Sequence, residues 1–314
     1  MDLKRYKIID CHCDTLTELQ DGENLSCERC VVSLQQLQAY GGYIQLFAAW
    51  IDDVNSAPLH TVLAIIDKFY QELSIHKGSI MQILSKEDFE KAFCGKKVGA
   101  MLTIENGNCL EGKLSNLRNL YRLGVRAMTL TWNGRNEIAD GIGESQRGGL
   151  SDFGSEVVEE MNRLGMMIDV SHLSEKGFLD VLSLSKVPVM ASHSNSRAIG
   201  SHLRNLTDEQ IKLLAEKGGV LGLNLYPLFL SDSGKADLED CLRHIEHITN
   251  VGGEDCLVLG SDFDGFSAEP IRDLRGPKDY VKLFDLLQKK GYSESFVEKF
   301  THQNFVAYAK QVLD

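Results

Sequence analysis

The sequence predicts a (β/α)8 TIM barrel, a fold of the α/β class, and three observations lead to this prediction. Short apolar runs alternate with longer amphipathic stretches, which favours parallel strands that are each followed by a helix. The first run leads into Asp10-Cys-His-Cys-Asp14 instead of a glycine-rich phosphate turn, which argues against the alternative of a doubly wound open sheet. The chain of 314 residues has the length of one barrel, so we expect residues 1–314 to form a single domain.

Eight apolar runs are the candidate strands. Their valine, isoleucine, leucine and methionine content is nearly continuous, as expected for strands that are buried on both faces of a parallel sheet. The runs are Tyr6–Asp14, Gly42–Ile51, Val98–Glu105, Val125–Trp132, Met166–His172, Val187–His193, Val220–Tyr226 and Cys256–Asp262.

Amphipathic stretches between these runs are the candidate helices, because apolar residues recur in them at spacings of three and four. Ser174 stands at one N-terminus, and Thr207 with Gln210 has the form of a capping box. Glycines stand where helix C-caps would precede the next strand, at Gly124, Gly165 and Gly218. The stretches are Leu59–Leu73, Glu156–Leu164, Lys176–Leu184, Thr207–Ala215, Leu238–Thr249 and Tyr280–Lys289.

The charge of the chain argues against two classes of partner. Asp and Glu number 45 against 33 Lys and Arg, which gives a formal net charge of −12, and no block of basic residues is present. We therefore expect neither nucleic acid nor an anionic membrane as a partner, because both require clustered Lys and Arg.

The sequence also bears on the location of the protein. No stretch approaches the roughly 20 apolar residues of a membrane span, and the N-terminal segment MDLKRYKIIDCHCD has no signal-peptide pattern. Eight cysteines in a chain of this length do not define a disulfide scaffold. We therefore expect a cytoplasmic protein with reduced thiols.

Side chains that commonly bind metals gather where the predicted strands end. In a barrel these ends meet at one mouth, where catalytic side chains cluster. An isolated histidine is usually a structural residue, but several at the same end of different strands indicate a shared site. His, Asp and Glu are expected ligands of zinc and similar ions. The candidate ligands are His12, Asp14, Glu105, His172 and His193.

The first strand presents two of these candidates together. Residues i and i+2 of a strand point to one face, so His12 and Asp14 are expected to face the barrel axis. By the same alternation Cys11 and Cys13 would point outward, toward the helices. This arrangement argues against a thiolate metal site.

Five ligands are too many for one tetrahedral zinc ion and suit two ions that share a carboxylate. Two-metal barrels often use a carbamylated lysine on the fourth strand as the bridge, but no lysine lies between Lys113 and Lys176. Glu105 is therefore the best candidate for the bridge. Two zinc, manganese or cobalt ions roughly 3.5–4 Å apart would bind a hydroxide that is ready to attack a substrate.

The run Val258-Leu-Gly-Ser-Asp-Phe-Asp-Gly265 supplies a candidate acid/base catalyst. Asp262 and Asp264 share a face if the strand continues, so strand alternation does not choose between them. Asp264 precedes Gly265 and has the character of a turn residue, so we assign proton transfer to Asp262.

These residues resemble the membrane dipeptidase (renal dipeptidase) family of zinc peptidases, peptidase family M19, among the amidohydrolase-like metal-dependent barrels. The resemblance extends through nearly the whole chain, and the order of the motifs is more specific than any one of them. They are Asp10-Cys-His-Cys-Asp14, Thr103-Ile-Glu-Asn-Gly107, Asp169-Val-Ser-His172, Ser192-His-Ser194, Gly260-Ser-Asp-Phe-Asp-Gly265 and Gln303-Asn-Phe.

The resemblance implies how the ligands divide between two zinc ions. His12, Asp14 and the bridging Glu105 would hold one ion. Glu105, His172 and His193 would hold the other.

The resemblance also assigns two residues to the substrate and its reaction. Asp262 matches the catalytic acid/base of the family. Arg204, in His202-Leu-Arg-Asn-Leu206, matches the arginine that binds the C-terminal carboxylate of a dipeptide. A planar guanidinium suits this bidentate contact better than a lysine.

One position departs from the family. After Arg126-Ala-Met-Thr-Leu-Thr131 the characterised enzymes carry a histidine that contacts the substrate, and this chain has Trp132. Indole donates one hydrogen bond but cannot become a cation, so substrate contacts here are expected to differ. Trp132 and the neighbouring Asn133 are the substrate-binding candidates at this position, with Arg135 and Asn136 as further substitutes.

The resemblance implies that the metal-bridging hydroxide hydrolyses the amide bond of a dipeptide, with tolerance of a D-residue at the C-terminal position. It is also compatible with a homodimer. Two alternatives remain open. One is another two-metal amidohydrolase, such as a cyclic amidase, deaminase or phosphotriesterase, although the first strand lacks His-x-His and the bridging lysine is absent. The other is a barrel that binds metal with little peptidase turnover.

Overall fold

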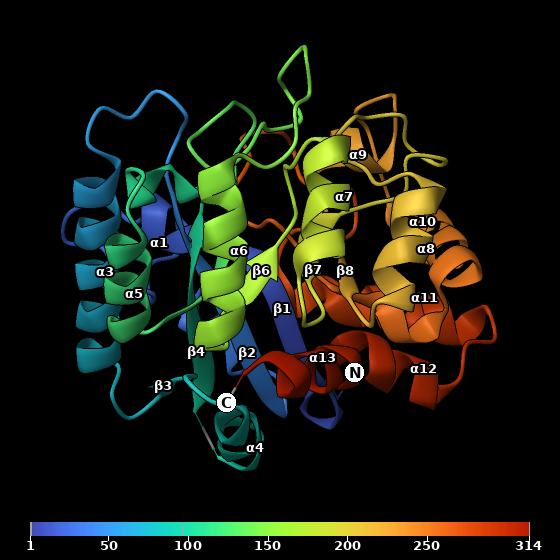
Figure 1. The fold of residues 1–314 in the computed structure, drawn as a ribbon. Helices are drawn as coiled ribbons and strands as arrows, with labels where there is room; N and C mark the ends of the chain where they lie inside the picture. The colour runs from blue at the N-terminus through green and yellow to red at the C-terminus, as the bar shows by residue number, and fades with distance from the viewer. Residues whose placement is uncertain (1, 96, 314) are drawn as a thin grey trace.

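Nine parallel strands form one sheet in the computed structural model, which describes residues 2–95 and 97–313. Their order is β2-β1-β9-β8-β7-β6-β5-β4-β3, and an additional pairing of β2 with β4 closes the sheet. All the strands except β3 therefore build a closed barrel, which confirms the predicted (β/α)8 fold (Figure 1). The strands are β1 Lys7–Cys13, β2 Gly42–Trp50, β3 Ile80–Gln82, β4 Val98–Glu105, β5 Val125–Thr129, β6 Met167–Asp169, β7 Met190–Ser194, β8 Val220–Leu223 and β9 Leu257–Leu259.

The short strand β3 is an addition to the predicted barrel. It pairs with Val98, Gly99 and Ala100 at the start of β4, whereas β5 pairs with β4 only from Leu102 onward. The two strands thus share one edge of β4, and β3 leaves the closure of the barrel unchanged. A run of three residues is too short to show a strand pattern in the sequence.

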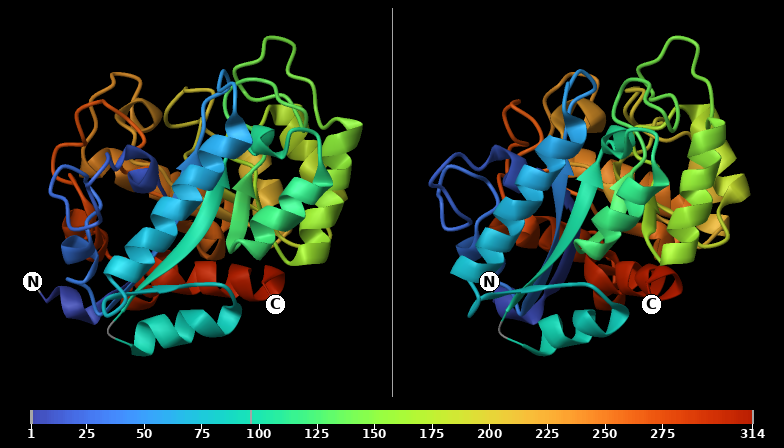
Figure 2. Two further views of the ribbon diagram at one scale, coloured as in Figure 1. Left: turned by 90° about the vertical axis from the view of Figure 1, so that its left-hand side faces the viewer. Right: turned by 60° about the vertical axis from the view of Figure 1, so that its left-hand side comes forward.

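Helices surround the barrel, as Figures 1 and 2 show. All six predicted helices are present, with bounds that differ by up to four residues. The largest difference is at α6, which begins at Asp152 because Ser151 caps it by accepting a hydrogen bond from the Gly154 amide. The helices are α1 Thr15–Glu18, α2 Leu34–Leu37, α3 Pro58–Ile75, α4 Lys86–Cys94, α5 Leu114–Arg122, α6 Asp152–Leu164, α7 Glu175–Leu184, α8 Asp208–Glu216, α9 Pro227–Leu230, α10 Leu238–Gly252, α11 Tyr280–Lys289, α12 Glu294–Glu298 and α13 Asn304–Val312.

The side chains that face the barrel axis include Cys11, so the prediction that Cys11 points outward is wrong. The pairing of β1 with β2 shifts register between Asp10 and Cys13, and this irregularity breaks the simple alternation of faces. Cys13 packs in the outer core, between barrel and helices, as predicted. Cys11 packs with the axial residues of the other strands, which include Ile9, Ile44, Leu46, Met101, Ala127, Met167, Met190, Val220 and Val258.

One end of the barrel is closed by two helices. Phe89 of α4 and the pair Phe305 and Tyr308 of α13 pack against the axial side chains. Both helices lie across the end opposite the loops that follow the strands (Figures 1 and 2). The polar strand ends therefore gather at the other end, the mouth of the barrel. Among the described helices, none has both the length and the apolar character that a bilayer crossing demands.

Candidate metal centre and active site

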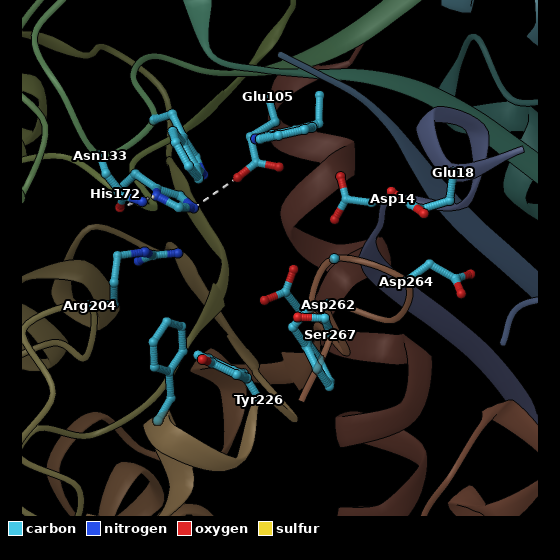
Figure 3. Close-up of a pocket in the computed structure, with 15 residues that line it drawn as sticks. Asp14, Glu18, Glu105, Asn133, His172, Arg204, Tyr226, Asp262, Asp264 and Ser267 are labelled. Carbon is cyan, nitrogen blue, oxygen red and sulfur yellow. Dashed lines mark hydrogen bonds and ion pairs between the residues drawn. The ribbon is translucent and has the colours of Figure 1, made fainter. Parts of the chain in front are cut away.

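Glu105, the last residue of β4, lies at the centre of the barrel mouth. Its Oε2 is 3.2 Å from His12 Nε2, on the side of β1. Its Oε1 is 2.8 Å from His172 Nε2 (Figure 3) and 3.6 Å from His193 Nε2, on the side of β6 and β7. One carboxylate therefore presents one oxygen to each of two groups of side chains.

All five predicted metal ligands lie in these two groups. His12, Asp14 and Glu105 form one, and Glu105, His172 and His193 form the other, with the candidate ligand atoms of each group within 4.8 Å of one another. All are buried, and His12 Nε2 and Asp14 Oδ1 have no hydrogen-bond partner among residues 2–95 and 97–313. Buried imidazole and carboxylate atoms without partners, converging on shared points, fit divalent cations such as zinc.

In the first group, burial and neighbouring charges shift the pKa values of both Glu105 and His12. Burial raises the pKa of the Glu105 carboxyl to about 7, although His12 opposes this shift. Burial also acts to lower the pKa of His12, but Asp14 and Glu105 outweigh it and hold that pKa well above its ordinary value. This cluster of buried carboxylates needs positive charge among its members, which a divalent cation supplies.

The second group contains two neutral imidazoles. Burial, together with the charges of Arg204 and His12, holds the pKa values of His172 and His193 well below the ordinary value. Their Nε2 atoms are 3.0 Å apart. Two neutral ring nitrogens this close to one carboxylate oxygen are suited to bind a metal ion.

The strands that carry three of the site residues end earlier than predicted. β6 ends at Asp169 and β9 at Leu259, before His172 and Asp262. His172 has a φ of 70°, Asp262 of 64° and Asp264 of 65°, which are left-handed conformations that non-glycine residues rarely adopt. Such backbone strain is concentrated at functional sites, where it directs side chains that a regular strand would not.

Asp262 and Asp264 have different surroundings. Asp262 lines the pocket, and its Oδ1 is 3.8 Å from His12 Nε2. Its Oδ2 accepts a hydrogen bond of 2.9 Å from Asn224 Nδ2, and burial raises its pKa although His12 opposes the shift. Asp264 also lines the pocket, but its carboxylate accepts hydrogen bonds from the backbone amides of Val31 and Val32, so it holds a loop in place.

Asn224 is a site residue that the sequence reasoning missed. It directly follows β8, and its own amide nitrogen donates to Asn195 Oδ1. The segment Gly222-Leu-Asn224 could have indicated this residue, because a polar side chain directly follows a buried strand there. Because Asn224 has neither a carboxylate nor an imidazole, its residue type does not mark it as a candidate metal ligand.

Arg204 reaches the pocket from the loop after β7. It is buried, with 5% of its surface exposed, and no ion pair is formed by it among the described residues. Its Nη1 lies 3.4 Å from Ser194 Oγ and its Nη2 lies 3.3 Å from His193 O, while Nε has no hydrogen-bond partner in the part of the chain that the structure describes. Burial lowers its pKa to about 10, and Asp262 and Glu105 oppose this shift. The group is therefore a cation at neutral pH with capacity for an anion.

Trp132 and Asn133 also line the pocket, whereas Arg135 and Asn136 do not. Trp132 packs edge-on against Trp50, with ring centroids 5.4 Å apart, and lies 6.3 Å from the His172 ring. Asn133 Oδ1 is 2.9 Å from His172 Nδ1. Arg135 instead pairs with Asp140 outside the pocket lining.

Asn136, the remaining substitute, is held by the neighbouring loop. Its side-chain amide donates to Asn106 Oδ1 and to the Leu130 carbonyl oxygen. It therefore supports the loop that carries Trp132 and is not part of the pocket wall.

The pocket over Glu105 has a volume of about 470 Å³. Arg204 lies on one side of it with Asn133 and His172, while Asp14, Glu18 and Asp264 lie on the opposite side (Figure 3). Its remaining wall is largely aromatic, formed by Trp50, Trp132, Tyr226, Phe229 and Phe266. The site thus combines a cationic side, an anionic side and apolar walls.

Comparison with known proteins gives the same family along the whole chain. Residues 3–314 match the family model of the membrane dipeptidases, peptidase family M19. A protein of Klebsiella pneumoniae, described as uncharacterised and encoded in the pqqA 5′ region, is 33% identical over 265 residues. The match covers 79% of this chain and 97% of that protein.

Two solved structures share the fold over almost their whole length. A metallopeptidase from Rhodobacter sphaeroides, liganded with a phosphinate mimic of the dipeptide L-Ala-D-Ala, has a TM-score of 0.88 at 24% identity and covers 98% of this chain and 99% of its own. Dipeptidase AC, a metallopeptidase of family M19, has a TM-score of 0.87 at 26% identity, with 98% of each chain covered. Both the family match and the donor groups at the barrel mouth lead to one conclusion. The chain belongs to the membrane dipeptidase family and is a metallodipeptidase.

Proposed function

We propose that this metallodipeptidase binds two zinc ions, with Glu105 as a ligand of both, and hydrolyses the amide bond of zwitterionic dipeptides. The observation that carries the proposal is the position of Glu105, whose two oxygens face the two donor groups at 3.2 and 2.8 Å from the nearest imidazole nitrogens. His12 and Asp14 would complete one metal site and His172 and His193 the other. Manganese and cobalt ions accept the same donors, so the metal titration includes them.

When bound, the two ions supply Lewis-acid polarisation of the scissile carbonyl and a water activated for attack. Side chains of the protein itself carry out the proton transfer. Asp262 has one oxygen held by Asn224 and the other directed toward the metal-ligand cluster, so it is placed to exchange a proton there. It takes a proton from the attacking water and passes it to the amine as the carbon–nitrogen bond breaks.

The charges of the pocket support a dipeptide as substrate. A dipeptide has a carboxylate at one end and an ammonium at the other, and the pocket has Arg204 on one side and carboxylates on the other (Figure 3). Arg204 binds the carboxylate with a fork of donors that is already desolvated. The aromatic walls suit apolar side chains on either residue.

Tolerance of a D-residue at the C-terminal position is a further part of the proposal. The Rhodobacter structure was liganded with a mimic of L-Ala-D-Ala, and this chain has the same fold around its own Arg204. Recognition of the carboxylate by a fork of donors fixes the end of the substrate, while the side chain can point in either direction. We therefore expect both L,L and L,D dipeptides to be hydrolysed.

A cytoplasmic location is also proposed. The eight cysteines are free thiols in the structure, and Cys11 and Cys13 are buried in the barrel wall. Reduced thiols are typical of cytoplasmic proteins. Cell fractionation with an antibody against the native protein tests this location.

The test is a panel of substrates with the zinc-loaded protein. It contains L,L and L,D dipeptides, the same dipeptides with an amidated C-terminus, and cyclic amides, aminopurines and phosphotriesters. We expect hydrolysis of the free dipeptides, much slower hydrolysis of the amidated dipeptides, and none of the other classes. Activity on cyclic amides, aminopurines or phosphotriesters, or none on any free dipeptide with two metal ions bound, would overturn the proposal.

A further inference from the structure

A chain of hydrogen bonds leads from His193 into the barrel interior. His193 Nδ1 lies 2.7 Å from Ser192 Oγ, and Ser192 Oγ lies 2.5 Å from Asp169 Oδ2. The three residues are at most 2% exposed. Asp169 and Ser192 are too far inside the barrel to line the pocket, and neither is in the metal-donor groups.

The direction of these hydrogen bonds follows from the surroundings of Asp169. Besides the Ser192 hydroxyl, its carboxyl receives the Thr129 hydroxyl at 2.6 Å and the backbone amides of Ser171 and Ser192 at 3.0 Å. A buried carboxyl that faces four donors acts as the acceptor in each contact. The single hydroxyl proton of Ser192 is therefore directed to Asp169.

This direction fixes the tautomer of His193. Because the Ser192 proton points to Asp169, the Ser192 oxygen accepts a hydrogen bond from Nδ1–H of His193. The lone pair of His193 is then on Nε2, the atom that faces Glu105 Oε1 and His172 Nε2. A ligand histidine is commonly held in this way by a partner at its remote nitrogen.

The other two histidines of the centre are held differently. His172 Nδ1 contacts Asn133 Oδ1, a neutral acceptor at the pocket wall. For His12, the polar side-chain contacts that the described residues show are made by Nε2, with Asp14 and Glu105. The path through Ser192 to a buried carboxylate therefore distinguishes His193, which, of the two proposed metal sites, belongs only to the one with Glu105 and His172.

We infer that Ser192 and Asp169 are positioning residues for the metal ion held by Glu105, His172 and His193, acting by fixing the tautomer and direction of the His193 ring. The inference rests on the proposed function only in that these three side chains bind a metal. It predicts that the two metal sites of one chain respond differently to changes at Ser192 and Asp169.

The experiment measures zinc affinity by competition with a chromophoric chelator, without any substrate. Ser192→Ala removes the hydrogen-bond partner, and the isosteric Asp169→Asn offers Ser192 a donor and so favours the opposite tautomer. In both variants we expect one of the two zinc sites to weaken by about 10- to 100-fold, while the other stays within about threefold of the wild type.

Thr129→Val is the matched control, because it removes another hydrogen bond to Asp169 but leaves the Ser192–His193 contact in place. We expect both zinc sites of this variant to stay within about threefold of the wild type. Equal weakening of both sites, no weakening, or the same loss in Thr129→Val would each overturn the inference.

A second measurement does not depend on metal binding. Long-range ¹H–¹⁵N spectra of the metal-free protein distinguish the two neutral tautomers of histidine. We expect His193 to carry its proton on Nδ1 in the wild type and to lose this preference in Asp169→Asn; a proton on Nε2 in the wild type would contradict the inference. Two zinc ions with normal affinities but no dipeptide hydrolysis would instead remove the proposed function and leave the positioning role intact.

Discussion

Replacement of Arg204 by methionine tests how the pocket recognises the end of its substrate. Arg204 is buried and contacts Ser194 Oγ and His193 O only at 3.4 and 3.3 Å, so little else holds its charge. Its guanidinium also lies 5.4 Å from the centroid of the Phe229 ring, a cation–π contact that methionine would replace with a sulfur–aromatic contact. The substitution thus removes the donors and largely preserves the packing.

The expected loss follows from the contacts that a carboxylate would make. A hydrogen bond between charged groups contributes about 1.5–3 kcal/mol, so a bidentate pair contributes about 3–6 kcal/mol. At 1.4 kcal/mol for each factor of ten, this corresponds to a fall in kcat/KM of about 10²- to 10⁴-fold. Because the carboxylate takes no part in the bond that breaks, we expect most of the loss in KM.

The assay compares each enzyme on a dipeptide and on the same dipeptide with an amidated C-terminus. The wild type should prefer the free acid by about 10²- to 10⁴-fold, and Arg204→Met should show almost no preference. An equal loss on both substrates would mean that Arg204 has a structural role. Equal rates of the wild-type enzyme on the free-acid and amidated dipeptides would mean that Arg204 does not recognise the C-terminal carboxylate.

Two further predictions concern proton transfer and pH. Asp262→Asn should lower kcat by about 10²- to 10⁴-fold while mass spectrometry still finds two metal ions per chain; full turnover would show that another group moves the proton. His244, buried and bonded to the Ser196 amide and the Leu230 carbonyl oxygen, has its pKa lowered by burial from 6.5 to about 4. Below pH 6.5 the unfolded chain therefore binds a proton at His244 before the folded protein does. The free energy of unfolding should fall by roughly 2 kcal/mol between pH 7 and 5 for this reason. In urea unfolding of the chelated protein, the loss between pH 7 and 5 should be roughly 2 kcal/mol smaller in His244→Gln than in the wild type, because the other buried histidines contribute equally to both; equal losses in both would contradict the assignment.

The cluster of candidate metal ligands was predictable because each of these residues lies at the end of an apolar run or directly after it. Glu105 ends the eight-residue strand β4, and His172 and His193 both follow a run into Ser-His, so local patterns locate them. The barrel brings these strand ends together at one mouth, which is a property of the fold and not of any one motif. This part of the site could therefore be derived before the structure was known.

The rest of the site depends on contacts between distant segments. The register shift in β1 depends on its pairing with β2, so the strand alternation that correctly placed His12 misplaced Cys11. Asn224 meets Asp262 across 38 residues of sequence, and Ser192 meets Asp169 across 23. An asparagine or serine in a buried strand has no distinctive local pattern, and only the fold shows which charged group it serves.

The most direct test of the two-metal dipeptidase is to restore activity to the chelated protein with measured amounts of zinc. Hydrolysis of an L,L dipeptide is followed as zinc is added to protein of known concentration. The shared carboxylate of Glu105 predicts that activity reaches its plateau at two zinc ions per chain, with little activity at one. A plateau at one zinc ion, or no return of activity with both sites filled, would contradict the two-metal account.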